Sequence, residues 1–190
     1  MKRICIGLTG RMASGKGEVV KLLEEKDYNY ISLSDIVREE ARREGTTVNR
    51  EHMQNIGNRL RQNGGAGVLG RMVKEKILAS KIPRWVIDGI RNPAEVRELR
   101  LLEGFLLLGV DADISVILER MKERNRDTDR MPEEELRKRL DREWGIGEPE
   151  NGQQVGPCMK LADITVTNNS SLDKLSMQIT NILNDLERKQ

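Results

Sequence analysis

The stretch from Gly10 to Gly17 reads Gly-Arg-Met-Ala-Ser-Gly-Lys-Gly, and these residue types at this spacing suit the binding of phosphate. An apolar run from Arg3 to Thr9 precedes it, and an amphipathic segment begins after it at Val19. Strand, glycine-rich loop and helix in that order bring backbone N–H groups onto anionic oxygens. Lys16 adds a mobile positive charge for the β- and γ-phosphates. The pattern predicts a P-loop for a nucleoside triphosphate. Its predicted phosphate-binding residues are Gly10, Ala13, Ser14, Gly15, Lys16, Gly17 and Glu18.

Two positions of this loop depart from the usual pattern. Gly17 stands where a serine or threonine commonly ligates Mg²⁺, and Glu18 follows it. A carboxylate beside phosphates is unfavourable unless it faces away or reaches the metal through water. Glu18 also fits the preference for acids in the first turn of a helix. Both explanations of Glu18 stay open, and the expected cofactors are ATP and Mg²⁺.

Length and composition indicate one globular domain over residues 1–190, with 37% hydrophobic residues. No apolar run is long enough to cross a membrane. The net charge of +2 and the 3% of aromatic residues argue against a nucleic-acid partner. The apolar N-terminal run leads into the loop and not to a cleavage site. We therefore expect a cytoplasmic monomer or homodimer with neither a membrane nor a nucleic-acid partner.

Strands and helices alternate along the chain, which predicts a parallel sheet covered by helices on both faces. The expected fold is a three-layer α/β/α P-loop NTPase with five parallel strands. Predicted strands are 3–9, 29–33, 85–88, 105–110 and 164–167. After the loop helix, which contains Val19, helices are expected at 36–43, capped by Ser34 and Asp35, and at 50–61, 68–79, 93–102, 113–124, 133–144 and 172–186, with an irregular stretch up to Pro157. Residues 45–80 form a helical insertion expected to bind an acceptor, and 119–145 form a charged, lid-like arm.

Ligands of parallel α/β sheets gather at the carboxyl ends of the strands. The second predicted strand leads to Ser32, Asp35 and Arg38, and the third leads to Asp88 and Arg91. Asp88 is expected to position Mg²⁺ directly or through water. Guanidinium groups bind phosphate bidentately, so we expect both arginines to hold an anionic acceptor. Ser32 and Asp35 complete the predicted acceptor site.

The arm at 119–145 carries nine basic and nine acidic residues between Glu119 and Glu143. Many of them have the spacing of ion pairs on a solvated helix surface. Arg120 and Arg124, however, share one helical face, which fits a lid that closes over phosphates and excludes water. Both residues are therefore candidate catalytic groups beside Lys16. Whether the arm is a mobile lid or a fixed ion-paired surface stays open.

Four segments resemble one known group of enzymes. Residues 31–38 and 86–91 resemble two motifs of adenylate kinases, the second without its usual proline. Residues 7–10 and 161–172 resemble dephospho-CoA kinases. Over nearly its whole length the chain resembles adenylate kinase-related, dephospho-CoA kinase-like proteins of the nucleoside monophosphate kinase superfamily. The resemblance implies that Arg38 grips an acceptor phosphate and that Asn168 lies near the adenine.

Loop and resemblance together predict a kinase that moves the γ-phosphate of MgATP to a small, nucleotide-like acceptor. A nucleoside or deoxynucleoside monophosphate needs no base, because its phosphate is already a nucleophile. A hydroxyl acceptor such as dephospho-CoA needs one, and Asp35 is the candidate. The alternative of another class is a non-catalytic nucleotide-binding switch. A GTPase is disfavoured because no Asn-Lys-x-Asp sequence occurs, and a mechanical ATPase because no second acid follows Asp88.

Overall fold

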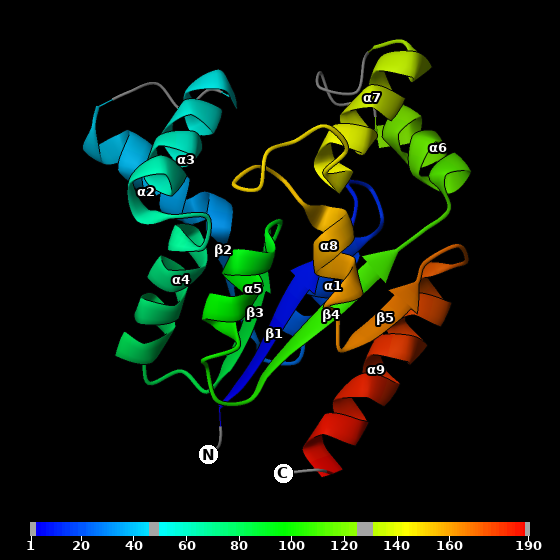
Figure 1. The fold of residues 1–190 in the computed structure, drawn as a ribbon. Helices are drawn as coiled ribbons and strands as arrows, with labels where there is room; N and C mark the ends of the chain where they lie inside the picture. The colour runs from blue at the N-terminus through cyan, green and yellow to red at the C-terminus, as the bar shows by residue number, and fades with distance from the viewer. Residues whose placement is uncertain (1–2, 46–49, 125–130, 189–190) are drawn as a thin grey trace.

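A computed structural model describes residues 3–45, 50–124 and 131–188, with a five-stranded parallel sheet at the centre (Figure 1). The strands are β1 Ile4–Thr9, β2 Asn29–Ser32, β3 Arg84–Asp88, β4 Phe105–Asp111 and β5 Ile164–Thr167. Their order across the sheet is β2-β3-β1-β4-β5, and every neighbouring pair is parallel. The predicted α/β fold is therefore confirmed.

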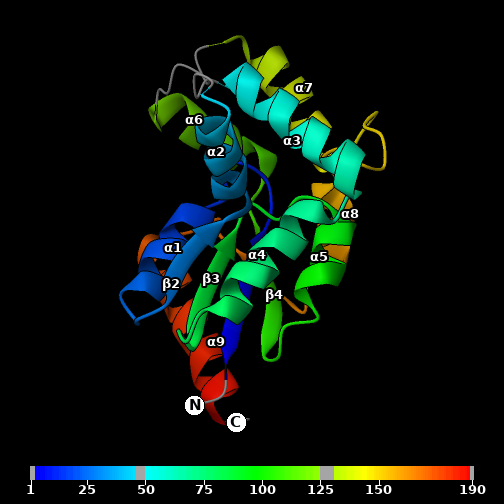
Figure 2. The same ribbon diagram turned by 90° about the vertical axis from the view of Figure 1, so that its left-hand side faces the viewer.

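Helices cover both faces of the sheet, as the apolar strands require. All six residues of β1 are buried, since Ile4, Ile6 and Leu8 pack on one face and Cys5 on the other. Figure 2 shows α1 and α9 on one side of the sheet and α4 and α5 on the other. The helices of these two layers are α1 Lys16–Glu24, α2 Leu33–Arg43, α4 Val68–Ala79, α5 Pro93–Leu99, α8 Val155–Lys160 and α9 Leu172–Arg188.

Three further helices lie beyond the carboxyl ends of the strands: α3 Arg50–Gly64, α6 Ile114–Arg124 and α7 Glu133–Trp144 (Figures 1 and 2). Buried apolar residues join α6 and α7 into a small core of their own, against which Met12 and Ala13 of the loop pack. The described part of the 119–145 arm is thus attached to the P-loop. Residues 125–130 of the arm lie outside the described residues. None of the helices in the described ranges has the length and apolar character that crossing a bilayer requires.

Two local predictions were wrong. Helix α2 begins at Leu33, and its N-cap is Ser32, not the pair Ser34 and Asp35. The Ser32 side chain accepts from the Ser34 amide while the Asp35 carboxylate accepts from the Ser32 amide, which forms a capping box. Residues Val155–Lys160, expected to be irregular up to Pro157, form α8. Proline is tolerated there because the first turn of a helix needs no N–H from it.

Both cysteines are fully buried, which predicts that their thiols react slowly. Burial raises the pKa of the Cys5 thiol to about 11 and that of Cys158 to about 12. Because the thiolate is the nucleophile, we expect neither cysteine to react with a disulfide reagent at pH 8 in the native protein. Denaturant should release both. Spectrophotometric thiol counting checks this, and rapid labelling of the native protein would contradict the burial described here.

Candidate active site

The loop between β1 and α1 has a backbone that only glycine permits at two positions. Gly10 has φ +136°, and a Cβ there would lie 2.0 Å from the Val110 carbonyl oxygen. Gly15 has φ +110°, and a Cβ there would lie 2.1 Å from Nδ2 of Asn168. Ala13 also adopts a left-handed conformation, with φ 58°. The sequence pattern of the loop thus reflects a tightly confined backbone.

This loop fits the phosphates of a nucleotide. Gly15 is the N-cap of α1 and provides no side-chain cap, and within the described residues the amides of Ala13, Gly15 and Gly17 donate no hydrogen bond. The hydroxyl of Ser14 is buried without a partner among those residues. Such N–H groups at a helix start form an anion site.

The loop's lysine bridges its first carbonyls. Lys16 Nζ donates to the Gly10 and Arg11 carbonyl oxygens at 2.6 and 2.8 Å. A bound phosphate oxygen offers this ammonium group a charged partner in place of two neutral ones. Glu18 turns away to Lys21, with 3.0 Å between carboxylate and Nζ on the exposed side of α1. The Glu18 carboxylate therefore faces away from the loop, and the residue lies in the first turn of α1, as acids prefer. Its predicted part in phosphate binding stays a prediction.

Arg120 and Asn168 both support the loop from the side of β4 and β5. Asn168 Nδ2 donates to the Ser14 carbonyl at 2.9 Å, and the backbone N–H of Asn168 donates to the Asp111 carbonyl oxygen. Arg120 donates to the Asn168 carbonyl at 2.8 Å and to that of Ser14 at 3.5 Å. The roles predicted for Arg120 in catalysis and for Asn168 near the adenine stay predictions. Arg124 ends α6, and the role predicted for its side chain stays a prediction.

Asp88 lies beside Ser32 where β3 and β2 end together. Its carboxylate accepts from the Gly89 amide at 2.7 Å. Burial raises the pKa of Tyr30, and the nearby carboxylates of Asp88 and Asp35 add to that shift. No cluster of three or more metal-ligating side chains occurs among the described residues, so a magnesium ion here would depend on phosphate and water ligands besides Asp88.

Asp35 and Arg38 form an ion pair with each other on α2. Asp35 also belongs to the capping box, and neither residue is among the described residues that line the neighbouring cavity. Arg91, in contrast, lines it. The two arginines predicted to converge on the acceptor are therefore not brought together in this cavity.

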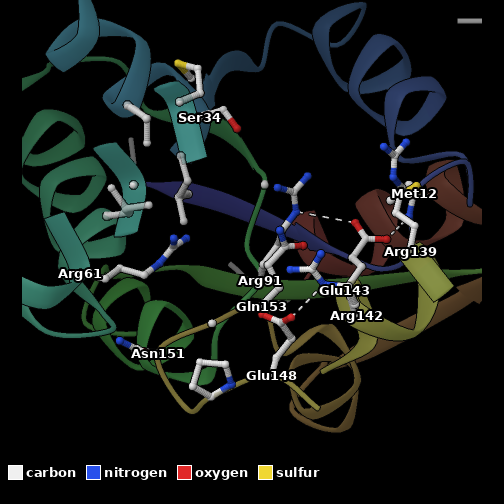
Figure 3. Close-up of a pocket in the computed structure, with 18 of the residues that line it drawn as sticks. Met12, Ser34, Arg61, Arg91, Arg139, Arg142, Glu143, Glu148, Asn151 and Gln153 are labelled. Atoms are coloured by element: carbon white, nitrogen blue, oxygen red, sulfur yellow. Dashed lines mark hydrogen bonds and ion pairs between the residues drawn. The ribbon is translucent and has the colours of Figure 1, made fainter. Parts of the chain in front are cut away.

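The cavity has a volume of about 530 Å³ and begins at Met12 of the loop (Figure 3). Four guanidinium groups and two carboxylates line it, so it carries a net positive charge. These residues are Arg61, Arg91, Arg139, Arg142, Glu143 and Glu148. Figure 3 shows Arg61 of α3 on one side, Arg139 of α7 on the other and Arg91 between them. Helices α2, α3 and α4 contribute apolar lining residues, namely Leu33, Val37, Met53 and Leu69.

Sequence reasoning missed three of these arginines. Arg139 and Arg142 have the i, i+3 spacing of one helical face, but the many acids around them favoured a solvated surface. Arg61 carried no local signal, because its position depends on Glu95 of another helix. Their convergence is a property of the tertiary structure.

Glu95 is fully buried and binds two of the arginines that line the cavity. Its carboxylate accepts from the amides of Arg91 and Asn92 at 2.9 and 3.0 Å and from the Arg61 guanidinium at 3.3 Å. Burial raises the pKa of Glu95, and the charge of Arg61 opposes that shift. One carboxylate thus fixes both a lining arginine and the turn that carries Arg91.

Replacing Glu95 with alanine is expected to lower the free energy of unfolding by about 3 kcal/mol, because the partly buried Arg61 guanidinium loses its partner. Glu98→Ala is the matched control on the same helix. Glu98 pairs with Lys74 at 2.7 Å and is partly exposed. Its loss should cost about 1 kcal/mol or less. Urea unfolding compares the two, and equal costs would contradict a structural role for Glu95.

A parallel sheet of order 2-3-1-4-5, a P-loop after β1 and a cationic cavity beside it define a kinase-like P-loop protein. The sequence profile of a family described as AAA domain matches residues 9–137. A UPF0200 protein of Methanoregula boonei is 31% identical over 97% of this chain and 98% of its own length. Another from Pyrococcus abyssi is 30% identical over 93% of both chains. The chain therefore belongs to the AAA-domain family and to the family of the UPF0200 proteins.

Solved structures agree on the fold. TT1252 from Thermus thermophilus superposes with a TM-score of 0.61 at 20% identity and covers 98% of this chain and 99% of its own. Shikimate kinase from Aquifex aeolicus gives a TM-score of 0.57 at 17% identity, with 98% of both chains covered. At these identities the likeness concerns the kinase-like P-loop fold alone.

Proposed function

We propose that the protein transfers the γ-phosphate of MgATP to a small anionic acceptor, of which a nucleoside or deoxynucleoside monophosphate fits best. The observation that carries this proposal is the cavity of about 530 Å³ that starts at Met12 and is lined by four arginines. Its volume lies within the range of small-molecule sites. Its surplus of positive charge suits the dianion of a phosphate monoester.

The lining also differs from one region to another in a way that suits a nucleotide. Side chains of α2, α3 and α4 supply an apolar surface for a ring, including Leu33 and Met53. Gln62, Asn151 and Gln153 supply amide donors and acceptors for the edge of a base. An apolar wall beside amide and charged groups suits a nucleotide, which offers a ring, polar base edges and a phosphate.

Each group then has a defined task. The loop amides and Lys16 hold the triphosphate, while Asp88 would hold Mg²⁺ through water. The ion, when bound, neutralises charge that develops during transfer. Arg91, Arg139 and Arg142 hold the acceptor phosphate in line with the donor. Because Asp35 lies away from the cavity lining, the geometry favours an acceptor that needs no base over the hydroxyl of dephospho-CoA.

Calorimetric titration with AMP, GMP, CMP, UMP and dephospho-CoA tests this proposal. Arg139→Ala should weaken binding of the best of these ligands by about tenfold or more, which is about 1.4 kcal/mol. Arg137→Ala is the control on the same helix, since Arg137 is exposed and pairs with Glu133. Equal affinities of both variants and the wild type would contradict an acceptor site at these arginines.

A further inference from the structure

Glu143 of α7 places a buried carboxylate at the junction of the loop and the cavity. Its Oε2 accepts from the Met12 amide at 2.7 Å, and its Oε1 lies 3.7 Å from Nε of Arg91. The residue is only 3% exposed. Figure 3 shows this carboxylate between Met12 and Arg91, with both interactions drawn. One side chain therefore contacts both the loop and the cavity.

The neighbouring residue strengthens the same contact. The Arg11 guanidinium lies 3.5 Å above the ring of Trp144, a cation–π distance. Gly156 of α8 packs directly against the indole of Trp144, since a Cβ at Gly156 would lie 2.7 Å from its Cε2 and Nε1 atoms. Residues 11 and 12 of the loop are thus held by consecutive residues at the end of α7.

A phosphate bound in the loop and the Glu143 carboxylate are two anions that compete for the space beside the loop amides. The Met12 amide, which donates to Glu143, directly precedes the Ala13 amide, one of the loop N–H groups expected to bind phosphate. Two anions repel strongly where one of them is buried, as the Glu143 carboxylate is. Filling the loop therefore favours a position of Glu143 away from Met12. The same helix carries Arg139 and Arg142, so such a movement reaches the cavity.

We propose that Glu143 is a positioning residue whose carboxylate, held beside the phosphate-binding amides of the loop, opposes a bound triphosphate and couples occupation of the loop to the arginines of the acceptor cavity. Only the coupling to the acceptor cavity rests on the proposed function. The competition with nucleotide holds whatever the acceptor is. Glu143 ties α7 to the loop and to Arg91, and a bound triphosphate displaces its carboxylate.

Calorimetry with MgATP tests the competition. Glu143→Gln removes the charge but keeps the shape, and we expect it to bind MgATP about tenfold more tightly than the wild type. Glu135→Gln is the control, because Glu135 is exposed on the same helix. Unchanged or weaker binding by Glu143→Gln would overturn the proposal.

A second measurement leaves Glu143 intact. Trp85→Phe makes Trp144 the sole tryptophan, because the chain has two. Saturating MgATP should shift the Trp144 emission as its contact with Arg11 changes, and an unchanged spectrum would overturn the proposal. With MgATP bound, the best monophosphate of the titration should bind severalfold more tightly to the wild type, and this gain should vanish in Glu143→Gln. If the monophosphate binds to neither the wild type nor Glu143→Gln, the result contradicts the proposed function but not the opposition between Glu143 and MgATP.

Discussion

Lys16→Ala is expected to lower ATP turnover by about a hundredfold or more, because it removes the one mobile charge of the loop. Lys16 Nζ already lies across the Gly10 and Arg11 carbonyls, so little rearrangement separates it from a bound phosphate. Steady-state ATP consumption in the presence of the best acceptor measures the effect. Circular dichroism should show an unchanged fold, since Lys16 begins α1 without contributing to its core.

The control for this variant is Lys21→Ala. Lys21 lies on the same helix, is exposed, and pairs with Glu18 and not with the loop. Its turnover should stay within about twofold of the wild type, as expected for an exposed pair. A Lys16→Ala protein that keeps a tenth or more of the activity would contradict the placement of the phosphates in this loop.

Gly10→Ala is expected to lower the free energy of unfolding by about 3 kcal/mol, as much as Glu95→Ala, through strain and overpacking together. The new Cβ would lie 2.0 Å from the Val110 carbonyl oxygen. Because this oxygen belongs to the backbone, rotation of a side chain cannot relieve the clash. Because β4 carries that oxygen, relief would require the loop to shift relative to the sheet. Urea unfolding monitored by fluorescence measures the change in the free energy of unfolding.

Gly17→Ala provides the comparison within the same loop. A Cβ at Gly17 meets nothing within 4 Å, and the residue lies in the first turn of α1. Alanine is the better helix former, so stability should rise by up to about 1 kcal/mol. If both substitutions destabilise the protein equally, the confinement of Gly10 described above is wrong.

The sequence was sufficient wherever local patterns agreed with one another. The apolar run of β1, the glycines of the loop and the amphipathic α1 each point to the same strand-loop-helix unit, and the structure contains it. Alternation of strands and helices likewise predicted the parallel sheet. The start of α2 was missed because Ser32 ends a strand and caps a helix at the same time.

The cationic cavity was harder to predict, because its groups come together only in three dimensions. Arg38 has a strong local motif but pairs with Asp35 one turn away. Arg61 has no motif, yet it reaches the cavity through its pairing with Glu95. Glu143 is one acid among nine in the arm, and only its contact with the Met12 amide distinguishes it. Burial and distant partners decide these roles, and neither follows from spacing along the chain.

The most direct test of the central claim is transfer of the labelled γ-phosphate of ATP with Mg²⁺ present. The acceptors to offer are ribonucleoside and deoxynucleoside monophosphates and dephospho-CoA, with a reaction lacking any acceptor as the baseline. We predict that one class of monophosphate receives the label and that Lys16→Ala abolishes this transfer. Tight binding of ATP without transfer to any of these acceptors would contradict the kinase assignment and favour a nucleotide-binding switch.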